Sequence, residues 1–186
     1  MRDPTIDYKT FRTSDELILF GLAAFKCAVP FWYKNSDMAQ RLYRALWDVY
    51  RDDTGALGPV RTLENELRLF RALLPPDVTK EQKDVAPFYV SMCADMVGMA
   101  LAIRSAFPAD LEMHRVYAMG AEMLSKMAAQ NHARVLATTV SEWYYSSYET
   151  EGLEIPGGLT AECERVEGRR QFDRILQEFS YLSSTA

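Results

Sequence analysis

Apolar residues recur along most of the chain at the three- and four-residue spacing of an amphipathic α-helix, and no segment sustains the alternation typical of strands. Prolines, glycines and capping residues separate these apolar segments. A chain of 186 residues with 48% hydrophobic residues can build one sizeable core, and no repeat or linker-like tract divides it. The sequence therefore predicts a single all-α domain over residues 1–186, a compact bundle of seven to eight helices.

Local capping signals set the predicted helix boundaries. Residues 13–16 fit a capping box, in which a threonine hydroxyl and a glutamate side chain satisfy each other's backbone amides. Thr62 is expected to cap the third helix, and Pro87 to stand at the start of the central one. The helical pattern of residues 108–148 is too long for one typical globular helix, so we predict a break near Asn131.

The compartment is predicted from charge and from the length of apolar segments. The first twelve residues carry charges of both signs, and no apolar stretch with a small-residue cleavage site follows them. The most apolar segments, residues 17–29 and 88–103, fall short of the ~20 residues that a bilayer span requires. Three widely separated cysteines suggest no disulfide framework. We therefore expect a cytoplasmic protein without membrane association.

Residue types that carry catalysis or bind metals are sparse. His114 and His132 belong to no metal-binding arrangement, and we expect both at the surface. The sequence contains no nucleophile elbow and no glycine-rich phosphate loop. A net charge of −5 argues against a nucleic-acid binder, which usually has a basic footprint. We expect no catalytic residue, no metal, no cofactor and no nucleic-acid partner.

Three ionisable residues stand within apolar helical segments: Lys26, Asp48 and Asp95. A buried charge is unfavourable unless it is paired and hydrogen-bonded. One interpretation places both aspartates at a pocket, where they are available for acid–base chemistry. In the other, each aspartate pairs with Lys26, Arg44 or Arg104, or caps a helix. The second interpretation is favoured because the neighbouring residues are apolar.

Seven of the nine methionines lie in two consecutive predicted helices, with a helical spacing that gives each set one face. Since helices joined by a short proline turn face each other, we expect these methionines to pack together in the core. The alternative is an adaptable groove for an apolar helix or ligand. The two sets are Met92, Met96 and Met99, and Met119, Met123 and Met127.

Charge is distributed unevenly near the C-terminus. Residues 142–164 contain six glutamates and no lysine or arginine, so this segment carries −6 and the remainder of the chain about +1. Tryptophan and tyrosine are favoured anchors of interfaces, and acidic groups beside them attract a basic partner. Alternatively, half of these aromatic side chains pack inward and the glutamates form an ordinary solvated loop. The predicted partner-binding residues are Glu142, Trp143, Tyr144, Tyr145, Tyr148, Glu149, Glu151 and Glu154.

Three short stretches carry a resemblance to a known family. They are residues 20–30 followed by an aromatic pair, the sequence from Tyr43 to Asp48, and Ala94-Asp95 within an apolar helix. In these features the chain resembles the YjaG-like family of uncharacterised bacterial proteins, over roughly residues 20–104 and more weakly beyond. The resemblance implies a small, soluble, all-helical protein. It implies no catalytic residue, because the family has no established activity.

These observations favour recognition over turnover. We expect a cytoplasmic protein-binding module, most concretely an immunity- or antitoxin-like protein that neutralises a basic partner such as a nuclease toxin. The first alternative is a helical enzyme or a small-ligand-binding protein with a pocket near Asp48 and Asp95. The second is a homodimeric scaffold that uses the same aromatic surface.

Overall fold

The structure, a computed structural model, describes residues 6–32, 36–52, 56–74, 85–147 and 157–185, without the side chains of residues 36, 105, 140–147 and 157–160. Helices make up all of the regular secondary structure in these ranges, which confirms the all-α class. The described residues form six α-helices instead of the predicted seven to eight, together with two short 3₁₀ helices, η1 (Tyr8–Thr10) and η2 (Val29–Phe31). The α-helices are α1 (Ser14–Ala28), α2 (Ser36–Arg51), α3 (Leu57–Ala72), α4 (Ala86–Ala106), α5 (Leu111–Ser147) and α6 (Gly157–Thr185).

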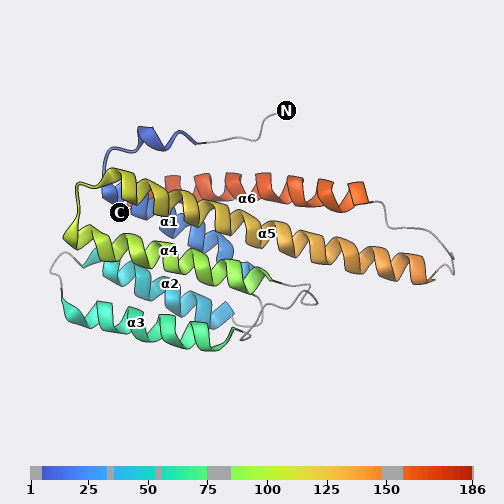
Figure 1. Cartoon of the computed structure of the whole chain (residues 1–186), viewed down its shortest axis with the longest axis horizontal. Helices are drawn as coiled ribbons and strands as arrows, with labels where there is room; N and C mark the ends of the chain where they lie inside the picture. The colour runs from blue at the N-terminus through green and yellow to red at the C-terminus, as the bar shows by residue number, and fades with distance from the viewer. Residues whose placement is uncertain (1–5, 33–35, 53–55, 75–84, 148–156, 186) are drawn as a thin grey trace.

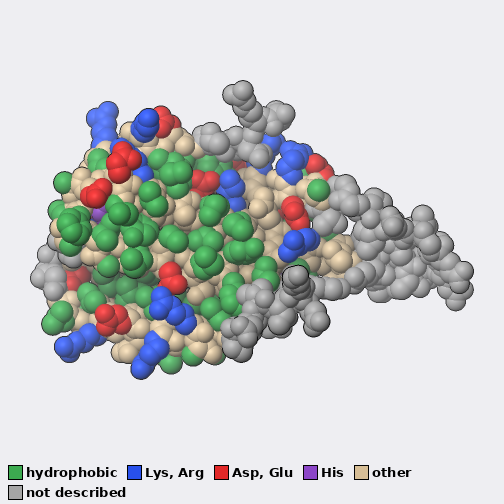
Figure 2. Space-filling view, viewed as in Figure 1, with side chains coloured by type: hydrophobic (Ala, Val, Ile, Leu, Met, Phe, Trp, Pro, Cys, Tyr) green, Lys and Arg blue, Asp and Glu red, His purple; other side chains and the backbone are tan. Residues whose placement is uncertain are grey.

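The helices lie side by side along the long axis of the molecule, with α3 at one edge and α6 at the other (Figure 1). α5 packs along both of its sequence neighbours, α4 and α6. α1 contacts α2, α4, α5 and α6, so it is the central helix of the bundle. Seen in space-filling form from the same side, the outer face over α4 and α5 carries many apolar side chains (Figure 2).

The central position of α1 explains its sequence. Thr13 Oγ1 accepts a hydrogen bond from the Glu16 amide at 3.1 Å, and the Glu16 carboxylate accepts one from the Thr13 amide at 3.3 Å. The predicted capping box is therefore confirmed. Beyond it, apolar side chains on every face of the helix are buried, including Phe20 and Phe25, which are fully buried. Burying each such side chain stabilises the fold by about 1.5–3 kcal/mol.

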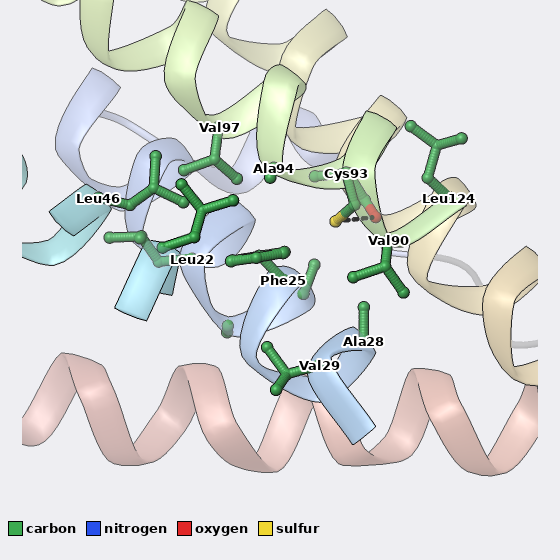
Figure 3. Packing of buried hydrophobic residues seen from close by; sticks show 14 of the residues in the cluster. Leu22, Phe25, Ala28, Val29, Leu46, Val90, Cys93, Ala94, Val97 and Leu124 are labelled. Carbon is green, nitrogen blue, oxygen red and sulfur yellow. Dashed lines mark hydrogen bonds between the residues drawn. The ribbon is translucent and has the colours of Figure 1, made fainter. Parts of the chain in front are cut away.

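The core gathers around α1, with the largest share of its buried side chains from α1, α2, α4 and α5 and further ones from α3 and α6 (Figure 3). Phe25 of α1 lies among side chains from the neighbouring helices, including Leu46 of α2 and Val90 of α4. Where α4 meets α5, Cys93 Sγ donates a hydrogen bond to the Ala121 carbonyl at 3.3 Å. Small residues at this contact let the two helices approach closely.

A buried polar network ties α1, α5 and α6 together. Gln171 Nε2 of α6 donates to the Cys27 carbonyl at 2.7 Å and to Ser125 Oγ at 3.0 Å. Ser125 Oγ in turn donates to the Ala24 carbonyl at 2.7 Å. The Cys27 carbonyl is one of the last four of α1, which have no partner within their own helix. The side chain of Gln171 therefore satisfies a helix end inside the core.

Two predicted helix boundaries are wrong. α3 begins at Leu57, five residues before the predicted cap, and the Thr62 hydroxyl instead donates to the Gly58 carbonyl at 3.1 Å from inside the helix. α5 continues through Asn131 without a break. Asn131 is buried, and its side-chain oxygen accepts a hydrogen bond from the Val85 amide at 2.9 Å, at the start of α4. Its polar group is thus satisfied by another helix.

Candidate functional site

The acidic, aromatic segment is described only in part. Its first residues, Glu142 to Tyr145, lie on the last turns of α5, which extends beyond the N-terminal end of α4 (Figure 1). Their side chains, and the whole of Tyr148, Glu149, Glu151 and Glu154, lie outside the described residues. The prediction that this segment binds a partner stays a prediction.

The glutamates at the far end of this segment are ion-paired. Arg165 Nε donates to Glu162 Oε2 at 2.8 Å, and this hydrogen bond holds the pKa of Glu162 below its ordinary value. Arg134 Nε of α5 lies 3.6 Å from Glu164 Oε1. Charge counted along the sequence therefore overstates the local negative charge, because arginines from α5 and α6 lie beside these carboxylates.

Lys26 is half-exposed at the surface of α1, where it meets α6. Its Nζ lies 2.6 Å from Glu178 Oε1, and the rings of Tyr43 and Tyr181 have their centroids at 6.0 and 5.8 Å. A charged partner and two aromatic faces stabilise the ammonium group. Lys26 therefore fits the structural interpretation of a paired charge, but its partner is neither Asp48 nor Asp95.

The two aspartates differ in their surroundings. Asp95 of α4 is half-buried, and its Oδ1 accepts a hydrogen bond from Arg71 of α3 at 2.6 Å. Asp48 of α2 is exposed, so its prediction as a buried polar residue is wrong. The helical periodicity of α2 places Asp48 on a different side from the buried Leu42 and Leu46. The structure does not bring the two aspartates together as an acid–base pair.

A cavity of about 720 Å³, here named the α3–α4 cavity, opens between α3 and α4 beside Asp95. Val49 near the end of α2 and Ser14 at the start of α1 also line it. Its walls are largely apolar, and its volume lies within the range of small-molecule sites. The less favoured interpretation placed a pocket near Asp48 and Asp95; this cavity lies beside Asp95, but the exposed Asp48 is not among the residues that line it. The apolar lining residues of α3 and α4 are Val60, Leu63, Leu67, Met99, Leu101 and Ala102.

Most of the clustered methionines lie on the outside of the bundle, so the expectation that they pack in the core is wrong. Met99 and Met119, for example, are each 50% exposed. Met96 and Met127 are half-buried, and Met96 is turned into the α4–α5 contact, where a Cβ at Gly120 would lie 3.0 Å from its Sδ. Because small residues fill this contact, the longer side chains stay outside. The methionine face, as we define it, consists of Met92, Met99, Val116, Met119 and Met123.

The methionine face belongs to α4 and α5, which pack against each other, and many apolar side chains are visible over these two helices (Figure 2). Contiguous exposed apolar surface is uncommon on monomeric soluble proteins and marks interaction sites. Methionine suits such a surface because its flexible, polarisable side chain adapts to partners of different shape. The sequence analysis did not predict this exposed face. Its alternative interpretation, in which the methionines form an adaptable groove for an apolar helix or ligand, rests on the same methionine spacing.

The apolar part of α4 is longer than the segment 88–103 considered above, and residues 86–104 are long and apolar enough to cross a membrane by length and composition alone. Core helices of soluble proteins pass the same test. The buried residues of α4, such as Val90 and Val97, belong to the main core cluster. Asp95 on its outer side is ion-paired to α3. These contacts favour a core helix.

Several titratable groups in the described ranges are buried or half-buried. His114 is fully buried, against the expectation of a surface position, and burial lowers its pKa. Burial also raises the pKa of Cys93, and that of Tyr8, whose hydroxyl donates to Glu122. No group of three or more His, Cys, Asp and Glu side chains in the described ranges could hold a metal ion.

In comparisons with known proteins, no family model, no curated protein and no solved structure matches this chain. The resemblance to the YjaG-like family stays a prediction.

Proposed function

We propose that this chain is a binding protein that recognises a partner protein through the methionine face. The observation that carries this proposal is the exposure of Met92, Met99, Met119 and Met123 on two adjacent helices. Burying this surface against a partner would remove apolar area from water, the main driving force of protein association.

The partner we infer is a basic protein that lays an apolar helix on the methionine face. Two antiparallel helices with exposed methionines offer a surface on which the i, i+3, i+4 and i+7 residues of an amphipathic helix can pack. The net charge of −5 steers a positively charged partner toward this chain and disfavours acidic competitors.

A narrower form of the proposal is an immunity- or antitoxin-like protein that neutralises a basic toxin. It rests on the acidic, aromatic residues 142–164, which begin on the same helix as part of the methionine face. Met119 and Trp143 are separated along α5 by about 36 Å, at 1.5 Å per residue. One elongated interface over that length would engage both surfaces.

The experiment compares the wild-type chain with a variant that carries Met92→Glu and Met119→Glu. Each tagged protein is used to recover partners from the native cells, and the dissociation constant of the recovered, purified partner is then measured at low and high salt. Two carboxylates buried in an apolar interface should weaken binding at least about 30-fold, since each contributes 1 kcal/mol or more. Association should also be slower at high salt.

Leu69→Glu provides the matched control, because Leu69 is an exposed apolar residue of α3 outside both the methionine face and α5. It should leave the dissociation constant unchanged. A partner that binds the double variant as tightly as the wild type would contradict the proposal, as would a partner with a strongly acidic surface. Recovery of a second copy of the chain would replace it with the homodimer. The narrower form requires that alanine at Trp143, Tyr145 and Tyr148 also abolishes binding.

A further inference from the structure

We infer that the α3–α4 cavity is a binding site for an amphiphilic cation, a small molecule with an apolar chain and a positively charged amine or quaternary ammonium group. This site lies beside the methionine face and shares only Met99 with it. The inference concerns a small ligand and goes beyond the proposed recognition of a protein partner.

The apolar walls of the cavity fit the chain of such a ligand. Leu63 and Leu67 of α3 face Met99 and Ala102 of α4 across the opening, and Val49 of α2 also lines the space. A volume of about 720 Å³ accommodates a drug-sized ligand, and pockets of this kind are mostly apolar with a few placed polar groups. The apolar part of the ligand therefore supplies the favourable burial.

The charges around the cavity select the sign of the polar group. Four carboxylates and two guanidinium groups line it, which gives a formal net charge of −2. The lining groups are Asp15, Asp52, Glu64 and Asp95, and Arg71 and Arg104. A cleft with low-dielectric walls and an excess of one sign of charge concentrates ligands of the opposite sign.

The two arginines are occupied by the protein itself. Arg71 Nη2 lies 2.6 Å from Asp95 Oδ1, and Arg104 Nε lies 3.0 Å from Asp15 Oδ1. Arg104 also donates to the Tyr50 carbonyl at 2.7 Å, and its guanidinium lies 5.2 Å from the centroid of the Tyr50 ring. An anionic ligand would have to compete with these contacts and approach four carboxylates, whereas those carboxylates attract a cation.

Two probes with the same ten-carbon chain length but opposite charge test the inference: decyltrimethylammonium and decanoate, both below their micellar concentrations. The protein carries ¹³C-labelled methionine methyl groups, so that each methionine reports separately in the NMR spectrum. Met99 lines the cavity, and Met123 is an exposed methionine elsewhere on the same side of the molecule. We expect a saturable shift of the Met99 methyl with decyltrimethylammonium, and at least about tenfold weaker binding of decanoate.

Two variants connect the binding to the cavity. Ala102→Phe places a large side chain into the cavity from an exposed position of α4, so it should weaken the binding of decyltrimethylammonium at least about tenfold. Ala72→Phe is the matched control: it makes the same change at an exposed position outside the cavity and should leave the binding unchanged. Glu64→Gln should weaken it about threefold, since one exposed charge is removed. Circular dichroism confirms that each variant remains folded.

Three results would overturn the inference. The first is the absence of a saturable shift at Met99. The second is equal affinity for the two probes, which would show that charge does not select the ligand. The third is a shift at Met123 as large as that at Met99, which would mean that the probe coats the methionine face. None of these results bears on partner binding by the Met92→Glu, Met119→Glu variant, so the two proposals fail separately.

Discussion

Replacing Gln171 by methionine tests whether the buried polar network holds α6 to the central helix. The new side chain has a similar length but donates no hydrogen bond, so Gln171→Met leaves the Cys27 carbonyl without its 2.7 Å partner. The 3.0 Å hydrogen bond to Ser125 Oγ is also lost, although this hydroxyl keeps its own acceptor, the Ala24 carbonyl. A buried carbonyl left unsatisfied costs about 1–3 kcal/mol, and a lost hydrogen bond about 1 kcal/mol.

Together these losses should lower the free energy of unfolding by about 2–3 kcal/mol, after a small gain from the more apolar side chain. Urea unfolding followed by circular dichroism at 222 nm measures the change by linear extrapolation. Gln177→Met makes the same chemical change at an exposed position of α6 and should stay within about 0.5 kcal/mol of the wild type. Equal effects of the two substitutions would refute the reasoning that Gln171 satisfies a helix end in the core.

Three further predictions follow from individual side chains. Burial lowers the pKa of His114 below 6.5, so on acidification the unfolded chain takes up a proton at this histidine before the folded chain does. The free energy of unfolding should therefore decrease below about pH 6.5, by up to about 1.4 kcal/mol per pH unit. The urea midpoint of the His114→Leu variant should depend less on pH than that of the wild type. Thr13→Ala should lower the free energy of unfolding by about 1 kcal/mol, and an unchanged urea midpoint would contradict the role of the capping box. At pH 8, iodoacetamide should alkylate Cys163 before the other two cysteines, because Cys93 is buried and burial raises the pKa of Cys27 to about 12. Peptide mass spectrometry measures the alkylation rate of each cysteine. Equal rates at Cys93 and Cys163 would argue against this packing.

The parts of the fold that sequence reasoning predicted correctly depend on near neighbours in the chain. Thr13 and Glu16 are three residues apart, so their capping box could be predicted from a short stretch of sequence. The same holds for Pro87, which occupies the first turn of α4 as predicted. Helix type and approximate position follow from such local signals.

The errors arise where the partner is distant in sequence. A break was predicted near Asn131 because the helical pattern is unusually long, but the Asn131 side chain accepts a hydrogen bond from Val85, 46 residues away. Nothing in the local pattern reveals that α4 supplies this donor. His114 was expected at the surface for the same reason, because its burial depends on how the start of α5 packs.

The candidate site was only partly predictable. The methionine spacing was evident, but whether the long side chains pack inward depends on Gly120 and Ala121, which let α4 and α5 approach closely. A pocket near Asp48 and Asp95 was only the less favoured interpretation, and the pairing of Asp95 with Arg71 could not be predicted without the position of α3. The charge count over residues 142–164 omitted Arg134, which lies beside Glu164 in space.

Oxidation of the methionines by hydrogen peroxide, read by peptide mass spectrometry, tests directly whether the methionine face is the recognition surface. Exposed methionines should be converted to sulfoxides rapidly in the isolated chain, because oxidation follows exposure. In the complex with its partner, Met92, Met119 and Met123 should be strongly protected, while the rate at the half-buried Met38 of α2 stays the same. Unchanged oxidation of the three face methionines in the complex would contradict the account.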